Sequence, residues 1–252
     1  MTEERTHTLL ITGGSRGIGR QTALLAARQG WNVGLGYVSN EQEATGVVAE
    51  IQASGGKALA VRCDVSVEAD VGRLFDSTQA RFGTIDRVVA NAGIVAPAAK
   101  LADMPVERIR RMFEVNILGS YLTAREAARR LSRSRGGEGG AIVLVSSIAS
   151  RLGSPAEFVD YAGSKGAIDT LAIGLAKELA PEGVRVNAVR PGLIETDMHA
   201  SGGQPDRVAR LGPTAPLGRA GMASEVAEAI IWLLGDSASY VTGAALDVSG
   251  GR

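Results

Sequence analysis

The 252-residue sequence contains one cysteine, Cys63, and only two histidines, His7 and His199. A single cysteine excludes an intrachain disulfide, and so few Cys and His residues argue against a zinc or iron site. We expect no metal, with a carboxylate site for a hard cation as the alternative that stays open. We expect Cys63, which follows an apolar run, to be an inert core residue. Lys and Arg together number 27, as do Asp and Glu, so there is no net charge. Composition therefore gives no electrostatic reason to expect nucleic acid as a partner.

Long hydrophobic runs are also missing. The longest ones, such as Ala141–Val145 and Ala229–Leu234, are far shorter than the ~20 residues that cross a bilayer. The stretch Met1–Thr8 carries charged side chains and lacks the apolar centre of a signal peptide. These absences predict a cytoplasmic protein that has no membrane partner.

Short apolar runs typical of strands alternate with longer helix-type segments. The expected strands are His7–Thr12, Asn32–Tyr37, Lys57–Arg62, Arg87–Ala90, Ala141–Ser146, Val184–Arg190 and Ala245–Val248. The expected helices lie near 17–30, 40–54, 67–82, 105–133, 158–180 and 224–235. Continuous apolar strands suit a parallel sheet that is buried on both faces. We predict one α/β domain over residues 1–252: a doubly wound, seven-stranded, mostly parallel sheet with helices on both faces.

One connection in this pattern is long. Residues 191–216 are rich in Gly, Pro and polar side chains, and they follow the sixth strand. A disordered insert is one interpretation of such a segment. Its position favours another, a lid over the substrate, because ligands of such sheets bind at the carboxyl ends of the strands.

Glycine is abundant, with 33 residues against an average share of ~7%. Three glycines, Gly13, Gly17 and Gly19, fall between the first strand and the first helix, in the pattern T-G-x-x-x-G-x-G. Glycine there allows a tight turn and lets backbone N–H groups at the helix start approach a pyrophosphate. The spacing is neither G-x-G-x-x-G nor a Walker A loop. It predicts a phosphate-binding turn.

Further along, Tyr161 and Lys165 lie one helical turn apart, so they share a helix face. The fifth strand ends at Ser146 and Ser147, and Asn116 lies in the preceding helix. Reduction of a ketone needs a hydride on carbon and a proton on oxygen, and a tyrosine can exchange that proton. The pair Tyr161 and Lys165 is weak evidence alone and gains meaning from the other motifs.

Together these motifs resemble the short-chain dehydrogenase/reductase superfamily, an NADP-preferring type with a Rossmann-type fold. They span most of the chain in the order of the family: the glycine turn, Asn91-Ala92-Gly93, Asn116, Ser147, Tyr161, Lys165 and Pro191-Gly192. Ala90 stands where the family has a further Asn, and we expect the site to tolerate this. Ser147 precedes Tyr161 by fourteen residues, one more than the usual family spacing, so Ser146 stays an alternative to Ser147.

The resemblance implies the roles of the site residues. The catalytic set is Asn116, Ser147, Tyr161 and Lys165. Tyr161 is the general acid or base, Ser147 binds the substrate oxygen, and Asn116 anchors a water behind Lys165. The cofactor-binding set is Gly13, Ser15, Arg16, Gly17, Ile18, Gly19, Tyr37, Ser39, Asn40, Asp64, Val65, Asn91, Ala92, Gly93, Tyr161, Lys165, Pro191, Gly192, Ile194 and Thr196. We expect the Lys165 ammonium and the oxidised nicotinamide to lower the pKa of Tyr161 by about two to three units.

The cofactor preference depends on the end of the second strand. No Asp or Glu occupies residues 35–40, where a carboxylate would hold the ribose 2′-hydroxyl. Arg16 in the phosphate turn suits a 2′-phosphate. We therefore expect NADP(H) in preference to NAD(H).

The resulting prediction is a carbonyl reductase or alcohol dehydrogenase that acts on a small molecule, with a sugar or 3-oxoacyl compound as substrate. By resemblance the chain forms a homotetramer or homodimer. We expect Asp160 and His199 to be solvated, and for each of them contact with the substrate is the alternative. Two alternatives stay open: a non-catalytic sensor that binds a dinucleotide on the same fold, and an interaction protein.

Overall fold

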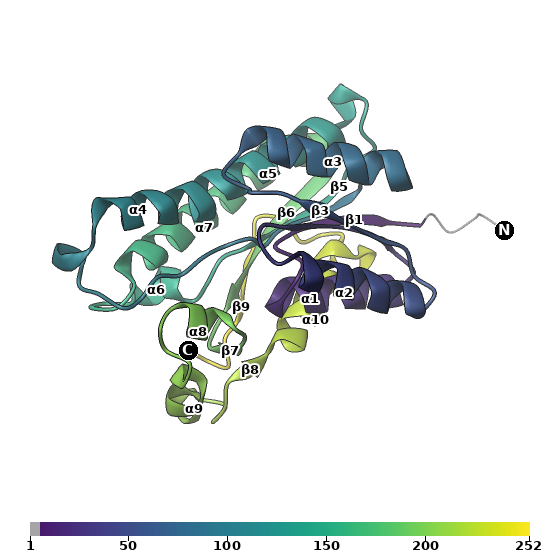
Figure 1. Ribbon diagram of the computed structural model, residues 1–252. Helices are drawn as coiled ribbons and strands as arrows, with labels where there is room; N and C mark the ends of the chain where they lie inside the picture. The colour runs from purple at the N-terminus through teal and green to yellow at the C-terminus, as the bar shows by residue number, and fades with distance from the viewer. Residues whose placement is uncertain (1–5) are drawn as a thin grey trace.

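The computed structural model describes residues 6–252 and shows a parallel sheet between two layers of helices (Figure 1). Its seven strands lie in the order β3-β2-β1-β4-β5-β6-β9. They are β1 (Thr8–Thr12), β2 (Asn32–Tyr37), β3 (Ala58–Arg62), β4 (Arg87–Ala90), β5 (Gly140–Val145), β6 (Val184–Pro191) and β9 (Ala245–Val248). This is the doubly wound α/β fold that the sequence predicts, and each predicted strand is present within one or two residues at its ends.

The helices divide between the two faces of the sheet. Their bounds are α1 (Gly17–Arg28), α2 (Glu41–Ala53), α3 (Glu68–Phe82), α4 (Val106–Phe113), α5 (Gly119–Leu131), α6 (Ala149–Leu152), α7 (Val159–Leu179) and α10 (Ala223–Leu234). One apolar core packs α1, α2 and α10 against the sheet, and the other packs α3, α5 and α7. The strands are apolar throughout because both of their faces are covered.

The predicted helix over 105–133 is interrupted. Helix α4 ends at Phe113, a π-helical turn follows over Glu114–Leu118, and α5 begins at Gly119. Such turns occur often at functional sites. The turn contains Asn116, which was expected in the catalytic set.

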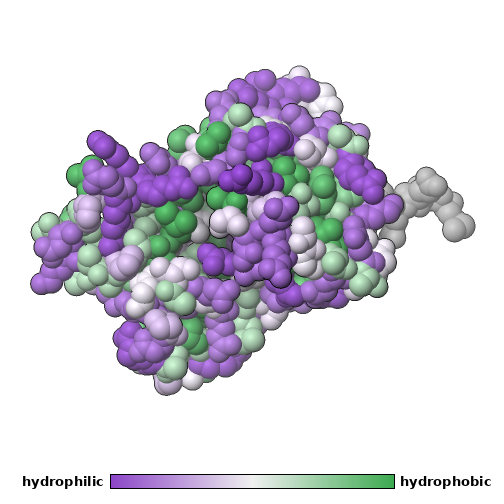
Figure 2. Space-filling model, in the orientation of Figure 1, coloured by the Kyte–Doolittle hydropathy of each residue, from purple (hydrophilic) through white to green (hydrophobic). Residues whose placement is uncertain are grey.

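The strand order reverses between β1 and its neighbour β4, which pair with Ile11 opposite Val89. Connections leave this point toward opposite faces of the sheet, so a crevice opens at the carboxyl ends of these strands. Figure 2 shows a hollow at the middle of this view of the surface, where apolar and polar residues meet.

Residues 191–216 are ordered into short elements that the sequence pattern did not indicate. They contain β7 (Ile194–Glu195), α8 (Met198–Ser201) and α9 (Arg207–Leu211), and β7 pairs with β8 (Gly221–Met222) in a small separate sheet. The interpretation as a disordered insert is therefore wrong. Across residues 6–252, no helix has the length and apolar character needed to span a membrane.

Candidate active site

Two hollows meet at the carboxyl ends of the strands. The Tyr161 cavity, of about 170 Å³, lies between the ends of β5 and β6, helix α7 and the segment 191–216. The Gly13 groove, of about 430 Å³, follows the glycine-rich turn after β1. The residues that line both are Ile18, Asn91, Thr196 and Met198. A ligand in the groove can therefore extend directly into the cavity.

The turn in the groove depends on glycine at three places. Gly13 and Gly17 have φ of +65° and +53°, a conformation that favours glycine. A Cβ on Gly19 would lie 2.2 Å from the carbonyl oxygen of Gly13. Asn91 holds the turn from β4, since its Nδ2 donates to the carbonyl oxygens of Thr12 and Gly13 at 3.0 and 2.9 Å.

Helix α1 begins directly at this turn. Its N-cap residue, Arg16, forms no side-chain cap hydrogen bond, so the first N–H groups of the helix stay available to a ligand. The positive end of the helix dipole points the same way. These features fit the phosphates of a dinucleotide, because a glycine cradle and free N–H groups are what an approaching pyrophosphate requires.

The far end of the groove follows β2. Tyr37, Ser39 and Asn40 line it, as expected, and the exposed Arg16 lies at its edge. Asn40 also caps α2, because its Oδ1 accepts a hydrogen bond from the N–H of Glu43 at 3.2 Å. Glu43 itself lines the groove, which the sequence reasoning missed because Glu43 lies one turn beyond the strand end.

Asp64 and Val65 line the middle of the groove, where the resemblance places the adenine. Arg111 of α4 also lines it and was not expected there. Its Nη2 donates to Asp64 Oδ2 at 3.0 Å, and its Nη1 donates to Ser66 Oγ at 3.0 Å. Although burial raises the pKa of Asp64, hydrogen bonds from Ser66 and Arg111 bring it below its usual value.

The remaining predicted cofactor residues divide between the two hollows. Those in the groove are Gly13, Ser15, Gly17, Ile18, Asn91, Ala92, Gly93 and Thr196. Those in the cavity are Tyr161, Lys165, Pro191, Gly192 and Ile194. Gly19 lines neither hollow and instead packs closely against the turn.

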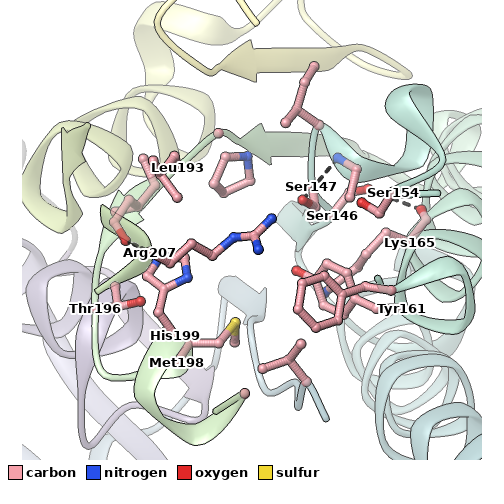
Figure 3. Close-up of a pocket in the computed structure, with 18 of the residues that line it drawn as sticks. Ser146, Ser147, Ser154, Tyr161, Lys165, Leu193, Thr196, Met198, His199 and Arg207 are labelled. Atoms are coloured by element: carbon pink, nitrogen blue, oxygen red, sulfur yellow. Dashed lines mark hydrogen bonds between the residues drawn. The ribbon is translucent and has the colours of Figure 1, made fainter. Parts of the chain in front are cut away.

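Ser147, Tyr161 and Lys165 come together in the Tyr161 cavity (Figure 3). Ser147 follows the end of β5, whereas Tyr161 and Lys165 lie one turn apart on α7. The Lys165 Nζ donates to the carbonyl oxygen of Val145 at 2.7 Å and lies 5.7 Å from the centroid of the Tyr161 ring. Lys165 is thus fixed by the end of β5, beside the phenol ring.

The two serines at the end of β5 differ in their bonding. Ser147 hydrogen-bonds the hydroxyl of Tyr161. Its Oγ also accepts the N–H of Ala149 at 3.1 Å. The buried Ser146 instead donates to the carbonyl oxygen of Lys165 at 3.0 Å. Only Ser147 contacts the tyrosine hydroxyl directly.

The pKa values of the pair respond mainly to burial. Burial raises the pKa of Tyr161, and the hydrogen bond from Ser147 opposes the rise. Burial lowers the pKa of Lys165 to about 8, against the attraction of the Asp169 carboxylate. The protein alone therefore shifts Tyr161 in the direction opposite to the expected one. A low pKa needs positive charge on the nicotinamide in addition to Lys165.

Asn116 is completely buried in the π-helical turn. Its Oδ1 accepts from the N–H of Ile94 at 2.8 Å, and its Nδ2 lies 3.0 Å from the carbonyl oxygen of Ile94 and 3.1 Å from Ser164 Oγ. The side chain thus ties the chain after β4 to helix α7. A Cβ on Gly93 would come within 3.5 Å of Lys165 Nζ, which shows how closely these segments pack.

Two residues that we expected to be solvated are not. The Asp160 carboxylate is 1% exposed and forms a two-pronged ion pair with Arg108 of α4, with Nε–Oδ2 and Nη2–Oδ1 distances of 2.9 and 3.2 Å. His199 lines the Tyr161 cavity, and its Nε2 lies 2.8 Å from the carbonyl oxygen of Ile194. Partial burial lowers the pKa of His199. The prediction for Asp160 was wrong because its partner, Arg108, lies on a helix that packs against α7 only in the folded chain. The prediction for His199 was wrong because the short helix α8 places its side chain in the cavity wall.

Other expectations concern residues outside the cavity. Cys63 is buried, and burial raises the pKa of its thiol to about 12, as suits an inert core residue. Within residues 6–252, no cluster of three or more His, Cys, Asp or Glu side chains is placed to hold a metal ion.

Comparison with known proteins identifies the class. The family model described as enoyl-(acyl carrier protein) reductase matches residues 13–252. An uncharacterized oxidoreductase of Escherichia coli is 51% identical over 96% of this chain and 98% of its own. L-rhamnose 1-dehydrogenase (NAD(P)(+)) of Sphingomonas is 38% identical over 97% of this chain and 95% of its own. The crystal structure of 3-ketoacyl-(acyl-carrier-protein) reductase from Brucella melitensis, complexed with NADH, has a TM-score of 0.89 at 32% identity and covers 98% of both chains.

The fold and the groove at the carboxyl ends of its strands are typical of dinucleotide-binding proteins. The chain belongs to the short-chain dehydrogenase/reductase superfamily, as its motifs suggested. It is an oxidoreductase of that family, and the family binds a nicotinamide dinucleotide.

Proposed function

We propose that the protein transfers a hydride between NADP(H) and a carbonyl compound or secondary alcohol, with Tyr161 as the general acid or base. The observation that carries this proposal is the convergence of Ser147, Tyr161 and Lys165 in a cavity that opens into the Gly13 groove. A non-catalytic sensor needs the groove alone. A sensor function does not explain why Ser147 is hydrogen-bonded to Tyr161 or why a buried lysine lies beside that tyrosine.

Each side chain has a role that its contacts support. The Tyr161 hydroxyl gives a proton to the carbonyl oxygen in reduction and takes one from the alcohol in oxidation. Ser147 donates a hydrogen bond to the same oxygen and stabilises the charge that develops there. The bound nicotinamide supplies or accepts the hydride. Lys165, held by the Val145 carbonyl, stabilises the phenolate through its nearby positive charge.

Asn116 has a different role, since its amide is fully engaged by Ile94 and Ser164. It holds the chain behind Lys165 in place. We propose, as the resemblance implies, that a water bound there completes a path for the proton.

The proposal of NADP(H) over NAD(H) rests on the far end of the groove. Arg16 is exposed there and forms no ion pair among residues 6–252, so its guanidinium is available to a 2′-phosphate. No carboxylate follows β2 directly, although Glu43 lies one turn further along. The cofactor contacts that we propose are the predicted residues that line the Gly13 groove and, in the Tyr161 cavity, Tyr161, Lys165, Pro191, Gly192 and Ile194.

The substrate class and the assembly are proposals as well. The names of the Sphingomonas and Brucella proteins support a sugar or a 3-oxoacyl compound as substrate. We propose that residues 1–252 form a single cytoplasmic domain, that the segment 191–216 is its lid, and that the chain assembles as a homotetramer or homodimer. An exposed apolar strip on α4 and α5, formed by Phe113, Leu118 and Tyr121, supports assembly.

Tyr161→Phe tests the function. NADPH consumption is measured over a panel of ketones, sugars, quinones and 3-oxoacyl thioesters. The variant should lose at least about 100-fold in turnover, because it lacks the proton donor, and should still bind NADPH. Tyr240→Phe is the matched control, since Tyr240 is fully exposed. Cofactor binding without turnover of any substrate by the wild type would instead indicate the sensor.

A further inference from the structure

Among residues 6–252, the side chains that line the Tyr161 cavity include basic ones and no acidic ones. Arg207 and Arg252 belong to this lining, no Asp or Glu does, and the histidine there, His199, is bonded to a backbone carbonyl. The rest of the wall opposite the catalytic residues is mainly apolar, with Val95, Leu193 and Met198 among it. A cavity with this charge favours a ligand that carries negative charge.

Arg207 is a basic lining residue that two hydrogen bonds hold in position. It begins α9 and extends from the side of Thr196 and His199 toward Ser147 and Tyr161 (Figure 3). Its Nη1 donates to Gln204 Oε1 at 2.6 Å, and its guanidinium carbon lies 5.0 Å from the centroid of the Phe158 ring. These contacts orient the guanidinium before any substrate binds.

Glu157 holds the same guanidinium from outside the cavity. The Arg207 Nη2 donates to Glu157 Oε2 at 2.8 Å. The Glu157 carboxylate is 36% exposed, so solvent screens its charge, whereas the Arg207 side chain is only 15% exposed. The hydrogen bond from Arg207 keeps the pKa of Glu157 below its usual value, so the pair stays ionic.

A guanidinium has five N–H donors, and protein partners account for two of those on Arg207. The others have no acceptor among residues 6–252. Because Arg207 lines the cavity, these donors are available to a ligand inside it. An oriented planar guanidinium with spare donors matches a carboxylate, which accepts two parallel hydrogen bonds.

We propose that Arg207 binds a carboxylate group of the substrate, so that the substrates are oxo acids and the corresponding hydroxy acids. The reacting oxygen lies at Ser147 and Tyr161, and the carboxylate lies toward the segment 191–216. This rests on the proposed function and specifies its substrate class. A neutral hydroxyl is a poorer match, because it has no charge to pair with the guanidinium and cannot accept two parallel hydrogen bonds from it.

A binding experiment tests the proposal without turnover. Titration calorimetry in the presence of NADPH compares cyclohexanecarboxylate with its uncharged counterpart, cyclohexanemethanol. The wild type should bind the carboxylate at least about tenfold more tightly, and Arg207→Leu should lose that preference. Arg28→Leu is the control, because Arg28 is an exposed arginine at the end of α1 that lines neither hollow. Equal binding of the two compounds by the wild type would overturn the proposal.

Kinetics separate the proposal from the general function. The reduction of 4-oxocyclohexanecarboxylate is compared with that of 4-(hydroxymethyl)cyclohexanone and cyclohexanone. Arg207→Leu should lower kcat/KM at least about tenfold for the oxo acid, mainly through KM, and should change the other two little. An equal loss for all three ketones, or a preference for the hydroxymethyl ketone, would contradict carboxylate binding. Absence of turnover with every ketone, together with carboxylate binding that depends on Arg207, would contradict the oxidoreductase function and leave the Arg207 site supported.

Discussion

The Gly13 groove and the Tyr161 cavity are neighbouring hollows that are built by different means. The groove consists of backbone at strand ends: a glycine turn with positive φ, the start of α1 and an asparagine that holds the turn. The cavity consists of side chains from distant segments, among them Ser147, Tyr161 and Arg207. The groove therefore tolerates little change in backbone, whereas the cavity can change its ligand by changing side chains.

The difference matches the two kinds of ligand that such folds bind. The phosphates of a cofactor are bound by backbone N–H groups of the turn and by the helix dipole. The substrate is recognised by loops that a rigid sheet positions. In this chain the segment 191–216 lines one side of the Tyr161 cavity, and it continues directly from β6 of the sheet.

Gly19→Ala tests whether cofactor binding depends on the backbone of the glycine turn. A Cβ there would lie 2.2 Å from the Gly13 carbonyl oxygen, so the turn must move. We expect cofactor affinity to fall by about 1,000-fold, or about 4 kcal/mol, as measured by calorimetry with NADPH. Gly46→Ala is the control, because a Cβ on this exposed helical glycine meets nothing within 4 Å. Unchanged affinity for NADPH in Gly19→Ala would show that cofactor binding does not need the close packing of the turn at Gly19.

Asp160→Asn tests whether the cavity depends on distant partners. The change leaves the charge of Arg108, 13% exposed, without its buried counter-ion next to Tyr161. The free energy of unfolding, from urea denaturation, should fall by about 3 kcal/mol, and kcat should fall because α7 is no longer held against α4. Asp206→Asn, at a carboxylate that is 72% exposed, should change stability by less than about 0.5 kcal/mol. If Asp160→Asn and Asp206→Asn changed the free energy of unfolding and kcat equally, the buried ion pair would not be what holds Tyr161 in position.

Lys165→Met tests how burial of the Lys165 ammonium in the cavity makes the stability of the protein depend on pH. The pKa of Lys165 is about 8 in the fold, below the usual value of 10.5, so the folded protein disfavours the charged form. The unfolded chain then binds more protons between these values, and the stability contributed by Lys165 rises as pH rises from about 8 toward 10.5.

Denaturation at two pH values measures this effect. Between pH 7 and about 9.5, the stability of the wild type should rise by about 2 kcal/mol relative to Lys165→Met. The result applies to the protein without cofactor. If the difference in stability between the wild type and Lys165→Met stayed constant with pH, burial would not lower the pKa of Lys165.

Arg16→Ser tests whether the far end of the groove distinguishes NADPH from NADH. Loss of the guanidinium should weaken NADPH by about tenfold, or about 1.4 kcal/mol, while NADH stays nearly unchanged. The measurement is the ratio of kcat/KM for the two cofactors at fixed ionic strength. The matched control is Arg28→Ser, a residue at the other end of α1. An equal loss for both cofactors would assign Arg16 to the shared phosphates instead.

The sequence predicted the groove better than the cavity, for physical reasons. Strands β1 to β6 and the glycine turn depend on local composition, and the order of strands follows from alternation with helices. Tyr161 and Lys165 were predicted because their spacing matches the family, and Ser147 because it follows the end of the fifth strand. The pairing of Asp160 with Arg108, 52 residues away, leaves no local pattern.

The elements of the segment 191–216 were missed for the same reason. Helices α8 and α9 have four and five residues, too short for a recognisable period, and β7 pairs with a strand that lies beyond the segment. The inward positions of Arg207 and His199 follow from how these short elements pack. Glu43 and Arg111 reach the groove from helices, so they are absent from any motif of the strand ends.

In the proposed reaction, NADPH bound in the Gly13 groove transfers its hydride to a substrate in the Tyr161 cavity. NADPH that carries deuterium at C4, in separate preparations labelled on each face, tests this transfer directly with a ketone that the enzyme reduces. We predict that one of the two preparations places a single deuterium on the new carbinol carbon, seen by mass spectrometry, and that Tyr161→Phe forms almost no labelled product. Alcohol that forms without deuterium from either preparation would contradict it.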